Sequence, residues 1–362
     1  MISGREAEIG GKSSYQKWLE SEGIPVIEEF YIKDIRKVPL EPWRRKEGFG
    51  VYLNLIGTGE TNNAYICEIP PGKSLKPQRH MFEEMIYVVA GRGATSVWLD
   101  RGPKQTFEWQ AGSLFSPPLN SWHQHFNGSG SDPVRYFAVT SAPLVINLFH
   151  NLDFVFGNNF DFTDRFTGDR DYFSGKGNSY TGRVWDTNFV PDVRNFALQE
   201  WSERGAGGKN IMLELSENTM AAHISEFPVG TYKKAHRHGP GAHVVIVGGE
   251  GYSLLRPEGS PTQKYEWQEG SVIVPPERWF HQHFNTGKSP ARYVALRWGS
   301  KKFRGSRKAY GVDESVKSGG DQIEYEDEDP MVHQEFEGAL ARAGVTCQMG
   351  KLHPSCRQRR GQ

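Results

Sequence analysis

The feature that most constrains this chain is an internal repeat: residues 72–127 recur as residues 230–285, with a constant offset of 158 and no gap. Near the end of each copy FEWQAGSLFSPPLNSWHQHFN is matched by YEWQEGSVIVPPERWFHQHFN, with 12 of 21 positions identical. Within each copy, short apolar or alternating runs are separated by Gly, Pro and Asn, which is typical of small antiparallel barrels. The sequence therefore predicts an all-β chain with two barrels in tandem and short helical additions.

The charge balance limits the classes of partner. The 362 residues include 43 basic and 43 acidic side chains, so the net charge is zero. This argues against a nucleic acid or a membrane surface as the main partner. The opening MISGREAEIGGKSSYQKWLE lacks the apolar run of a signal peptide, and no stretch is long enough to span a bilayer. We therefore expect a soluble, cytoplasmic protein that acts on a small molecule.

The cysteines bear on redox compartment and metal chemistry. Only Cys67, Cys347 and Cys356 are present. Their wide spacing suits a reducing compartment and argues against both a disulfide framework and a cysteine-built zinc site. Any metal is therefore expected to be held by His, Glu or Gln.

The regions outside the repeat differ in composition. Residues 14–21 predict a short helix, residues 189–201 a second, and HQEFEGALARAG a third because its apolar residues have helical spacing. The final KLHPSCRQRRGQ is expected to be frayed. The expected regions are an N-terminal arm (1–50), a first barrel domain (51–145), a connector (146–208), a second barrel domain (209–300) and a C-terminal tail (301–362).

The second copy contains three histidines with metal-ligand spacing. His236 and His238 are two apart, so on a strand both imidazoles point the same way. His281 is expected on a neighbouring strand. Three neutral imidazoles can bind one side of an ion and leave the other side open, as in a catalytic metal site.

The first copy has a different set of candidate ligands. Gln78, His80, Glu84 and His123 occupy the corresponding positions. An amide oxygen is a weak ligand for a soft divalent ion, whereas Glu84 supplies a negative charge. Both a second metal site and an empty, structural barrel remain open for this copy.

Both copies match the two motifs of the cupin signature, and the chain resembles a bicupin. The first motif reads G, five residues, HxH, three or four residues, E, six residues, G. The second reads G, five residues, PxG, two residues, H, three residues, N. Its histidine and asparagine are His123 and Asn127 in the first copy, and His281 and Asn285 in the second. In the second copy Ala242 stands at the Glu position. That set is similar to the three-histidine cupin dioxygenases of the gentisate and salicylate type. The resemblance implies two jelly-roll barrels, Fe(II) as cofactor, O2 as co-substrate and a homo-oligomer.

Further side chains are candidates for substrate binding or proton transfer. His283 and His125 share a strand face with the motif histidines, where each could orient a substrate or pack in the core. His243 points out of the barrel in the gapless register, although a one-residue loop difference would make it a ligand. Arginines at positions 256, 292 and 297 lie on predicted strands and could clamp a carboxylate. Of all these, we assign catalytic roles to His283, Arg292 and Arg256.

Three functions remain open from the sequence. The first is a mononuclear Fe(II) dioxygenase that cleaves a small aromatic or oxygenated organic acid, with an anionic, bidentate substrate favoured because the three ligands are neutral. The second is a lyase or isomerase on a sugar acid or carboxylate, which uses manganese, zinc or nickel as a Lewis acid. The third is a bicupin that binds a ligand without catalysis.

Overall fold

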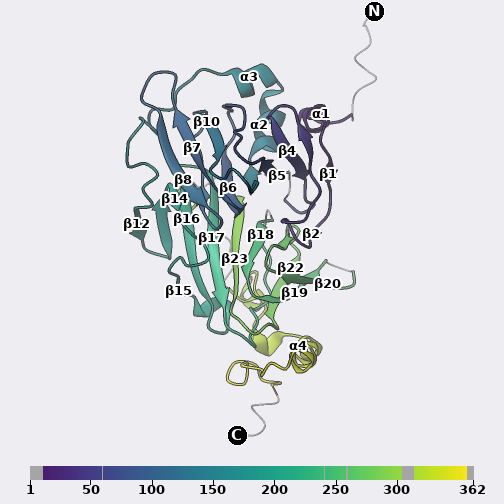
Figure 1. Cartoon of the computed structure of the whole chain (residues 1–362). Helices are drawn as coiled ribbons and strands as arrows, with labels where there is room; N and C mark the ends of the chain where they lie inside the picture. The colour runs from purple at the N-terminus through teal and green to yellow at the C-terminus, as the bar shows by residue number, and fades with distance from the viewer. Residues whose placement is uncertain (1–10, 59, 240, 258–259, 304–313, 357–362) are drawn as a thin grey trace, which may run out of the picture.

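The chain folds into two β-sandwich barrels, each with a large and a small sheet (Figure 1). The computed structural model describes residues 11–58, 60–239, 241–257, 260–303 and 314–356. The first barrel lies at the top of Figure 1 with the N-terminal helix, and the second lies below it with the C-terminal helix. The all-β prediction with two barrels in tandem is confirmed.

The first barrel has a large sheet in the order β1-β4-β5-β11-β6-β9-β14, with β3 paired to β4, and a small sheet in the order β10-β7-β8. The strands of the large sheet are β1 (Val26–Ile27), β3 (Glu41–Trp43), β4 (Gly48–Leu53), β5 (Asn63–Ile69), β6 (Glu84–Ala90), β9 (Leu114–Phe115), β11 (Val134–Thr140) and β14 (Phe189–Val190). The strands of the small sheet are β7 (Arg92–Trp98), β8 (Gln105–Gln110) and β10 (Trp122–Asn127).

The second barrel repeats this plan. Its large sheet runs β12-β13-β16-β17-β23-β18-β21-β2, with β15 paired to β16, and its small sheet runs β20-β19-β22. The strands of the large sheet are β2 (Tyr31–Ile32), β12 (Gly177–Tyr180), β13 (Val184–Thr187), β15 (Gln199–Glu200), β16 (Lys209–Leu215), β17 (Met220–Phe227), β18 (His243–Gly248), β21 (Val272–Ile273) and β23 (Ala291–Trp298). The small sheet consists of β19 (Glu250–Arg256), β20 (Gln263–Gln268) and β22 (Phe280–Asn285).

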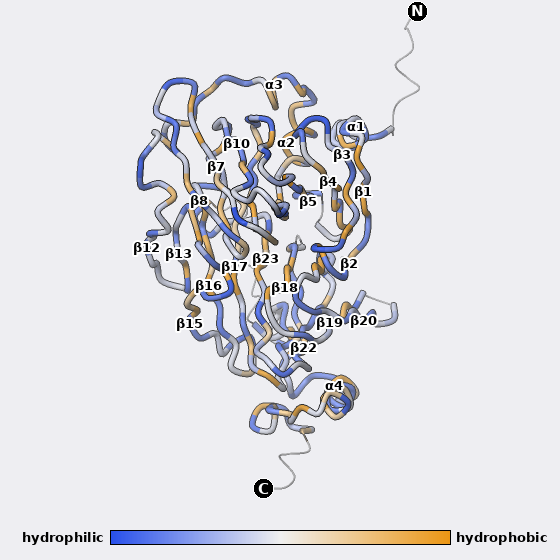
Figure 2. The backbone as a smooth tube through the Cα atoms, in the orientation of Figure 1, coloured by the Kyte–Doolittle hydropathy of each residue, from blue (hydrophilic) through white to orange (hydrophobic). Residues whose placement is uncertain are grey.

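The largest apolar core lies between the barrels rather than inside either one. It joins side chains of the first barrel, such as Leu53 and Phe137, to side chains of the second, such as Leu213 and Leu296, all of which are buried. Apolar residues colour the central strands of both large sheets in Figure 2. Because alternate residues of a strand face opposite sides, one face of each large sheet lines its own barrel and the other packs on the neighbouring barrel.

Each barrel also takes a short strand from the segment that precedes the other barrel. Strand β2 of the N-terminal arm pairs with β21 of the second barrel, and β14 of the connector pairs with β9 of the first. Both strands are followed by an Asp and Arg pair: Asp34 accepts from Arg36 at 2.8 Å and Asp192 from Arg194 at 2.8 Å. The predicted helix over residues 189–201 is wrong, because this segment forms β14 and β15 instead.

The helices lie at the two ends of the molecule (Figure 1). Helix α1 (Ser14–Ser21) confirms the predicted bounds and begins at a capping box formed by Ser13 and Gln16. The other α-helices are α2 (Ala142–Phe149), α3 (Leu152–Gly157) and α4 (Pro330–Ala343), and the short 3-10 helices are η2 (Ser202–Arg204), η3 (Val316–Ser318) and η4 (Tyr325–Asp327). Helix α4 confirms the predicted helical spacing. Among the described residues, no helix has both the length and the apolar character needed to cross a membrane.

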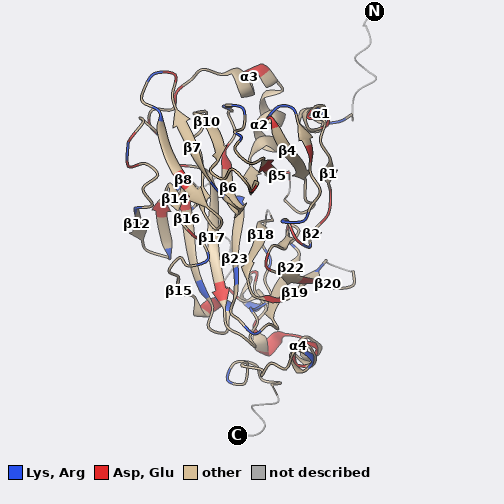
Figure 3. Ribbon diagram, in the orientation of Figure 1, with Lys and Arg blue, Asp and Glu red and all other residues tan. Residues whose placement is uncertain are grey.

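Charged residues of both signs are spread over the two barrels and the helices rather than collected on one side of the ribbon (Figure 3). This distribution agrees with the zero net charge of the chain. Electrostatic attraction of an extended polyanion would need a surface dominated by one sign of charge.

Candidate metal centres

The first barrel brings His80, Glu84 and His123 together. Glu84 begins β6 and His123 lies on β10, while His80 precedes them in a loop. The Oε2 atom of Glu84 is 3.7 Å from the Nε2 atom of His80 and 3.6 Å from the Nε2 atom of His123. All three atoms are buried without a hydrogen-bond partner. Two imidazoles and one carboxylate converging in this way form an open, facial ligand set for a divalent ion.

Backbone carbonyls orient both imidazoles of this centre. The Nδ1 atom of His80 is 2.8 Å from the carbonyl oxygen of Phe82, and the Nδ1 atom of His123 is 3.1 Å from that of Ser121. A carbonyl only accepts, so each Nδ1 carries the proton and each Nε2 presents a lone pair to the centre. Burial lowers the pKa of His80 to about 4, which keeps the ring neutral.

The surroundings of Glu84 are basic. Burial alone would raise the pKa of this carboxyl, but the charge of Lys46 holds it well below its usual range. The Nζ atom of Lys46 is 3.9 Å from Oε1 of Glu84, and Tyr65 donates a hydrogen bond to the same oxygen. Gln78 lies beside this group, but its Oε1 atom accepts from Arg45 at 3.0 Å. The amide oxygen is thus engaged by Arg45, which weakens Gln78 further as a ligand.

The cavity above the first centre is small. It measures about 10 Å³, close to the space that one ordered water needs. Its walls come from the arm, the strands and the loop before β6, and they are Trp18, Arg45, Lys46, Tyr52, Asn63, Tyr65, Gln78, His80, Phe82, Glu84 and Thr140. Helix α1 contributes Trp18, so the arm lies across this barrel. The closed cavity leaves no room for an organic substrate next to a metal ion.

The second barrel brings His236, His238 and His281 together, as the sequence predicts. Each offers a ring nitrogen within 4.8 Å of the others. The ring centroids of His236 and His281 are 4.2 Å apart, and those of His238 and His281 are 4.9 Å apart. The Nδ1 atoms of His236 and His281 are each 3.1 Å from a backbone carbonyl oxygen two residues earlier, which leaves Nε2 free to bind an ion.

Positive side chains rather than carboxylates surround this second centre. Burial lowers the pKa of His238 most. The neighbouring His281 lowers it next, and the charges of Arg297 and Arg204 add to this effect. Within the described residues, the ligand group contains the three histidines and no acid. Glu214 is the acid that acts on Arg297. His238 is only half-buried, whereas His80 and His123 are buried, so the second centre reaches the surface.

Comparison with known proteins shows which sequences and folds this chain resembles. The family model for the cupin domain matches residues 65–140. A mutant oxalate decarboxylase of Bacillus subtilis has a TM-score of 0.50 at 12% identity, over 75% of this chain and 78% of that chain. The chain has the bicupin fold. The Lactobacillus farciminis oxalate decarboxylase in complex with formate has a TM-score of 0.49 at 15% identity, over 75% of this chain and 87% of that chain. None of the curated proteins matches the sequence.

His283 has the same partners in the second barrel of the bicupin as its counterpart has in the first. Its Nδ1 atom is 2.7 Å from the hydroxyl of Ser253, which accepts from Trp267 at 3.0 Å. In the first barrel, His125 contacts Thr95, which accepts from a tryptophan at the equivalent position. The duplicated arrangement fits a packing role below each centre. The catalytic assignment of His283 therefore has no contact that supports it beyond proximity to His281.

The structure does not bring Arg256 and Arg292 to the second centre. Arg256 donates to Gln282, whose side chain alternates away from those of His281 and His283. Arg292 donates to the carbonyl oxygen of Arg194 in the connector at 2.6 Å and is 3.4 Å from Glu226. Both predicted roles in substrate binding are corrected, because strand alternation turns these side chains outward.

His243 lies between the two barrels of the bicupin. It is fully buried, its ring centroid is 5.9 Å from that of Phe137 in the first barrel, and both of its ring nitrogens lack a hydrogen-bond partner. Burial lowers its pKa to about 3. The gapless register, which turned this side chain away from the three histidines, is therefore confirmed, and His243 is not a ligand.

Several residues near the centres escaped the sequence interpretation. His223 and Arg204 both lower the pKa of His238, and they are offset by 158 residues from Tyr65 and Lys46, which line the first cavity. The same repeat that identified the histidines thus extends to these positions. Arg297 shares a face of β23 with Tyr293, whose ring contacts those of His223 and His283. Strand alternation alone would have selected Arg297 over Arg292.

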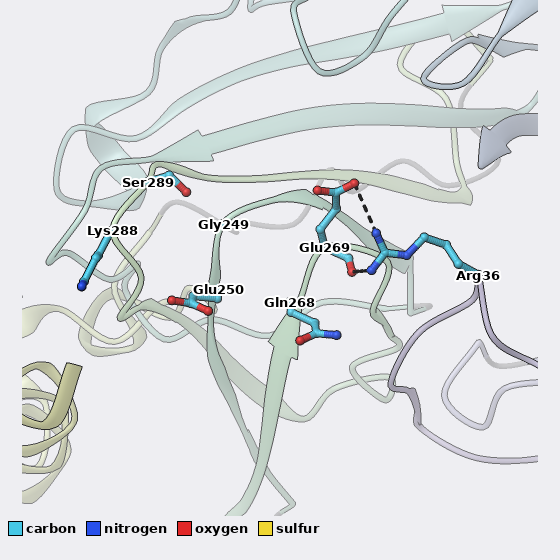
Figure 4. Close-up of a pocket in the computed structure, with 7 residues that line it drawn as sticks. All are labelled: Arg36, Gly249, Glu250, Gln268, Glu269, Lys288 and Ser289. Atoms are coloured by element: carbon cyan, nitrogen blue, oxygen red, sulfur yellow. Dashed lines mark hydrogen bonds and ion pairs between the residues drawn. The ribbon is translucent and has the colours of Figure 1, made fainter. Parts of the chain in front are cut away.

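A polar hollow of about 460 Å³ lies elsewhere on the second barrel. It is lined by turns of that barrel and by the arm, with the residues Arg36, Gly249, Glu250, Gln268, Glu269, Lys288 and Ser289 (Figure 4). Arg36 donates to the carbonyl oxygen of Glu269 at 2.7 Å and pairs with its carboxylate at 3.5 Å. No histidine of either centre lines this hollow, so it is not part of them.

Proposed function

We propose that this bicupin is a metal-dependent enzyme that binds a small organic acid at the three-histidine centre of the second barrel. The observation that carries the proposal is the charge of this centre. His236, His238 and His281 are neutral ligands, and Arg204 and Arg297 add positive charge beside them. A divalent ion there would keep its full charge, so an anionic substrate is favoured as the group that balances it.

The reaction we propose is oxidative cleavage of that acid by O2, with Fe(II) as the cofactor. Three protein ligands leave up to three positions on an octahedral ion, enough for a bidentate substrate and O2. A ferrous ion supplies, when bound, the electron-transfer chemistry that O2 requires. The support is the three-histidine ligand set itself, and manganese, zinc and nickel are the alternative metals. We also propose that the protein acts as a homo-oligomer.

The protein's own residues have defined tasks in this proposal. Arg297 and Arg204 hold the substrate carboxylate, since a guanidinium group can donate two parallel hydrogen bonds to it. The backbone carbonyls behind His236 and His281 fix the tautomer of each ring. Lys233 is buried and donates to the hydroxyl of Tyr293 at 3.0 Å, which keeps a proton donor close to His283.

A second candidate is a redox-neutral lyase or isomerase. The observation that favours it is the first centre, where Lys46 and Tyr65 are proton donors in contact with Glu84. Such groups suit a reaction in which a metal only polarises the substrate and a side chain supplies the proton. The oxalate decarboxylases that share the fold belong to the lyase class by name. The closed cavity of the first barrel counts against this candidate unless the arm moves.

The test compares the two barrels in matched variants of protein purified without oxygen. Metal content, O2 uptake and CO2 release would be measured with a panel of small mono- and dicarboxylic acids. His281→Ala removes a ligand from the second centre, and His123→Ala removes its counterpart from the first. We expect iron near one per chain and O2 uptake that only His281→Ala abolishes.

Other outcomes decide between the candidates. CO2 release without O2 uptake, lost in His123→Ala, would favour the lyase. Activity unchanged in His281→Ala would refute the assignment to the second barrel. If neither barrel binds a metal under these conditions, only the third function remains, binding of a ligand without catalysis.

A further inference from the structure

A third cluster of metal-ligating side chains lies outside both barrels, where the C-terminal tail packs on the second one. Helix α4 places His333 and Glu337 one turn apart on the same face. The loop after the helix brings Cys347 and Cys356 to that face, where both thiols are buried. One ligand atom from each of the four residues lies within 4.8 Å of all the others. The sequence spacing argued against a cysteine-built zinc site, but the fold brings two of the three cysteines together beside a histidine and a glutamate.

Two of the separations within the cluster match those of ligands on a tetrahedral ion. The two Sγ atoms are 3.6 Å apart, and tetrahedral Zn–S bonds of about 2.3 Å would place them about 3.8 Å apart. The Nε2 atom of His333 is 3.4 Å from the Oε1 atom of Glu337. Zn–N and Zn–O bonds of about 2.1 Å would give this separation to within about 0.1 Å. Both pairs are at the spacing of atoms that share one ion.

The proton on His333 is placed by its other neighbours. The hydroxyl of Tyr232 donates to Glu328 at 2.7 Å, so its oxygen can accept from the Nδ1 atom of His333, 3.1 Å away. Nδ1 then carries the proton and Nε2 presents a lone pair toward the carboxylate of Glu337. Nε2 is buried without a hydrogen-bond partner. A lone pair facing a carboxylate oxygen is repulsive unless a cation lies between them.

The remaining surroundings hold this arrangement in place. The ring of His353 stacks on that of His333, with centroids 4.1 Å apart and planes 7° apart. Its Nε2 atom is 3.4 Å from the Oε2 atom of Glu328, so His353 pairs with that carboxylate. Burial raises the pKa of Cys347 to about 12. A metal ion binds cysteine as the thiolate, so an ion that binds these two thiols displaces protons from them.

We propose that His333, Glu337, Cys347 and Cys356 bind a structural Zn2+ ion. Two thiolates, one imidazole and one carboxylate form a closed tetrahedral set, and thiolate with imidazole selects zinc over the harder ions. The four side chains fill all positions of such an ion, so this site differs in kind from the open centres of the barrels.

The zinc site fixes the tail to the second barrel beside the three-histidine centre. Phe336 of α4 packs against Tyr232 and Phe284 of the barrel. Glu328 accepts from Gln282, the residue between His281 and His283, at 2.6 Å. The ion thus anchors a segment that contacts both chain segments bearing the metal-binding histidines. This role does not depend on which reaction the barrels perform.

Cobalt(II) loading of the full-length wild-type protein is the direct test, because a thiolate ligand to cobalt produces an intense near-ultraviolet charge-transfer band. The barrel centres contain no cysteine ligand, so the band reports only on the tail. We expect the band in the wild type, its loss in Cys356→Ser, and its retention in Cys67→Ser and His281→Ala. Cys67 is the matched control, since it is also buried but lies in the first barrel.

Zinc content provides the second measurement. Protein purified without chelator should retain one zinc ion per chain more than Cys356→Ser does, and Zn2+ added to the chelated, reduced wild type should release about two protons per ion. If Cys356→Ser fails to fold, the wild-type band and the proton release still decide the question. A wild type without the cobalt band, a band that survives in Cys356→Ser, or a Cys347–Cys356 disulfide in metal-free native protein would overturn the proposal.

Discussion

Glu84→Gln is the substitution whose effect follows most directly from the structure. Glu84 and Lys46 are 1% and 2% exposed in their side chains, with Nζ and Oε1 3.9 Å apart. The glutamine keeps the shape of the side chain but removes its charge. It leaves the ammonium group of Lys46 buried without its counter-ion. It also removes the one carboxylate that the described part of the chain supplies to the first metal centre.

The magnitude can be worked from the separation. Two unit charges at 3.9 Å attract by about 4 kcal/mol at an effective dielectric constant of about 20. Breaking a buried pair by removing one partner typically costs about 3–5 kcal/mol. Burial lowers the pKa of Lys46 and the charge of Glu84 raises it, so removing that charge lowers the pKa further. We expect Glu84→Gln to reduce the free energy of unfolding by about 3 kcal/mol at neutral pH.

A double-mutant cycle isolates the pair. Lys46→Met alone should also destabilise the protein, whereas Glu84→Gln combined with Lys46→Met should recover about 2 kcal/mol relative to the sum of the single changes. Urea unfolding of the metal-free protein, followed by tryptophan fluorescence and far-ultraviolet circular dichroism, measures these differences. Glu108→Gln, at an exposed position of β8, is the control and should change stability by less than about 0.5 kcal/mol. A Glu84→Gln variant as stable as this control, or strictly additive effects, would refute the reasoning.

Three other predictions follow from buried or bridging groups. The His243→Leu variant should lose less stability than the wild type on acidification, because the folded-state pKa of His243 is lowered to about 3 and the unfolded chain takes up its proton first. Between pH 6.5 and 4 the difference in free energy of unfolding should reach about 3 kcal/mol. Parallel curves of stability against pH would contradict this prediction. Arg297→Met should leave the metal content unchanged and weaken the binding of a small carboxylate by about tenfold or more, as measured by calorimetry, whereas loss of metal with unchanged affinity would argue against its role. Asp34→Asn and Asp192→Asn should each lower the free energy of unfolding by about 1 kcal/mol through the strands that the barrels exchange, and an effect of only one of them would break the proposed equivalence.

Strand patterns and the repeat predicted a large part of the architecture and of the second centre. His236 and His238 were expected on a strand but lie in the segment between β17 and β18, where an isolated bridge pairs His236 with His281. The gapless register turned His243 outward. The same reasoning applied to β23 would have chosen Arg297, two residues from Ala295 and four from Tyr293, over Arg292. The domain boundaries and the substrate remain predictions.

The repeat also reaches further than its most similar stretch. DIR at residues 34–36 and DVR at residues 192–194 keep the same offset, and they follow the two exchanged strands β2 and β14. A helix was predicted for the second of these segments because its local pattern allows one. The segment forms a strand instead because it pairs with β9 of the first barrel. This pairing satisfies backbone hydrogen-bonding groups, and a local sequence pattern does not show that such a partner is present.

The sequence by itself determined the two barrels in tandem and the three histidines that meet in the second one, because these depend on periodicity, on the repeat and on spacing within short segments. Tertiary structure decided which distant groups share a charge or an ion. Lys46 reaches Glu84 only after the arm folds over the first barrel, and Cys347 and Cys356 reach His333 only after the tail turns back on α4. Such contacts depend on how separate segments pack, and a linear pattern does not encode those distances.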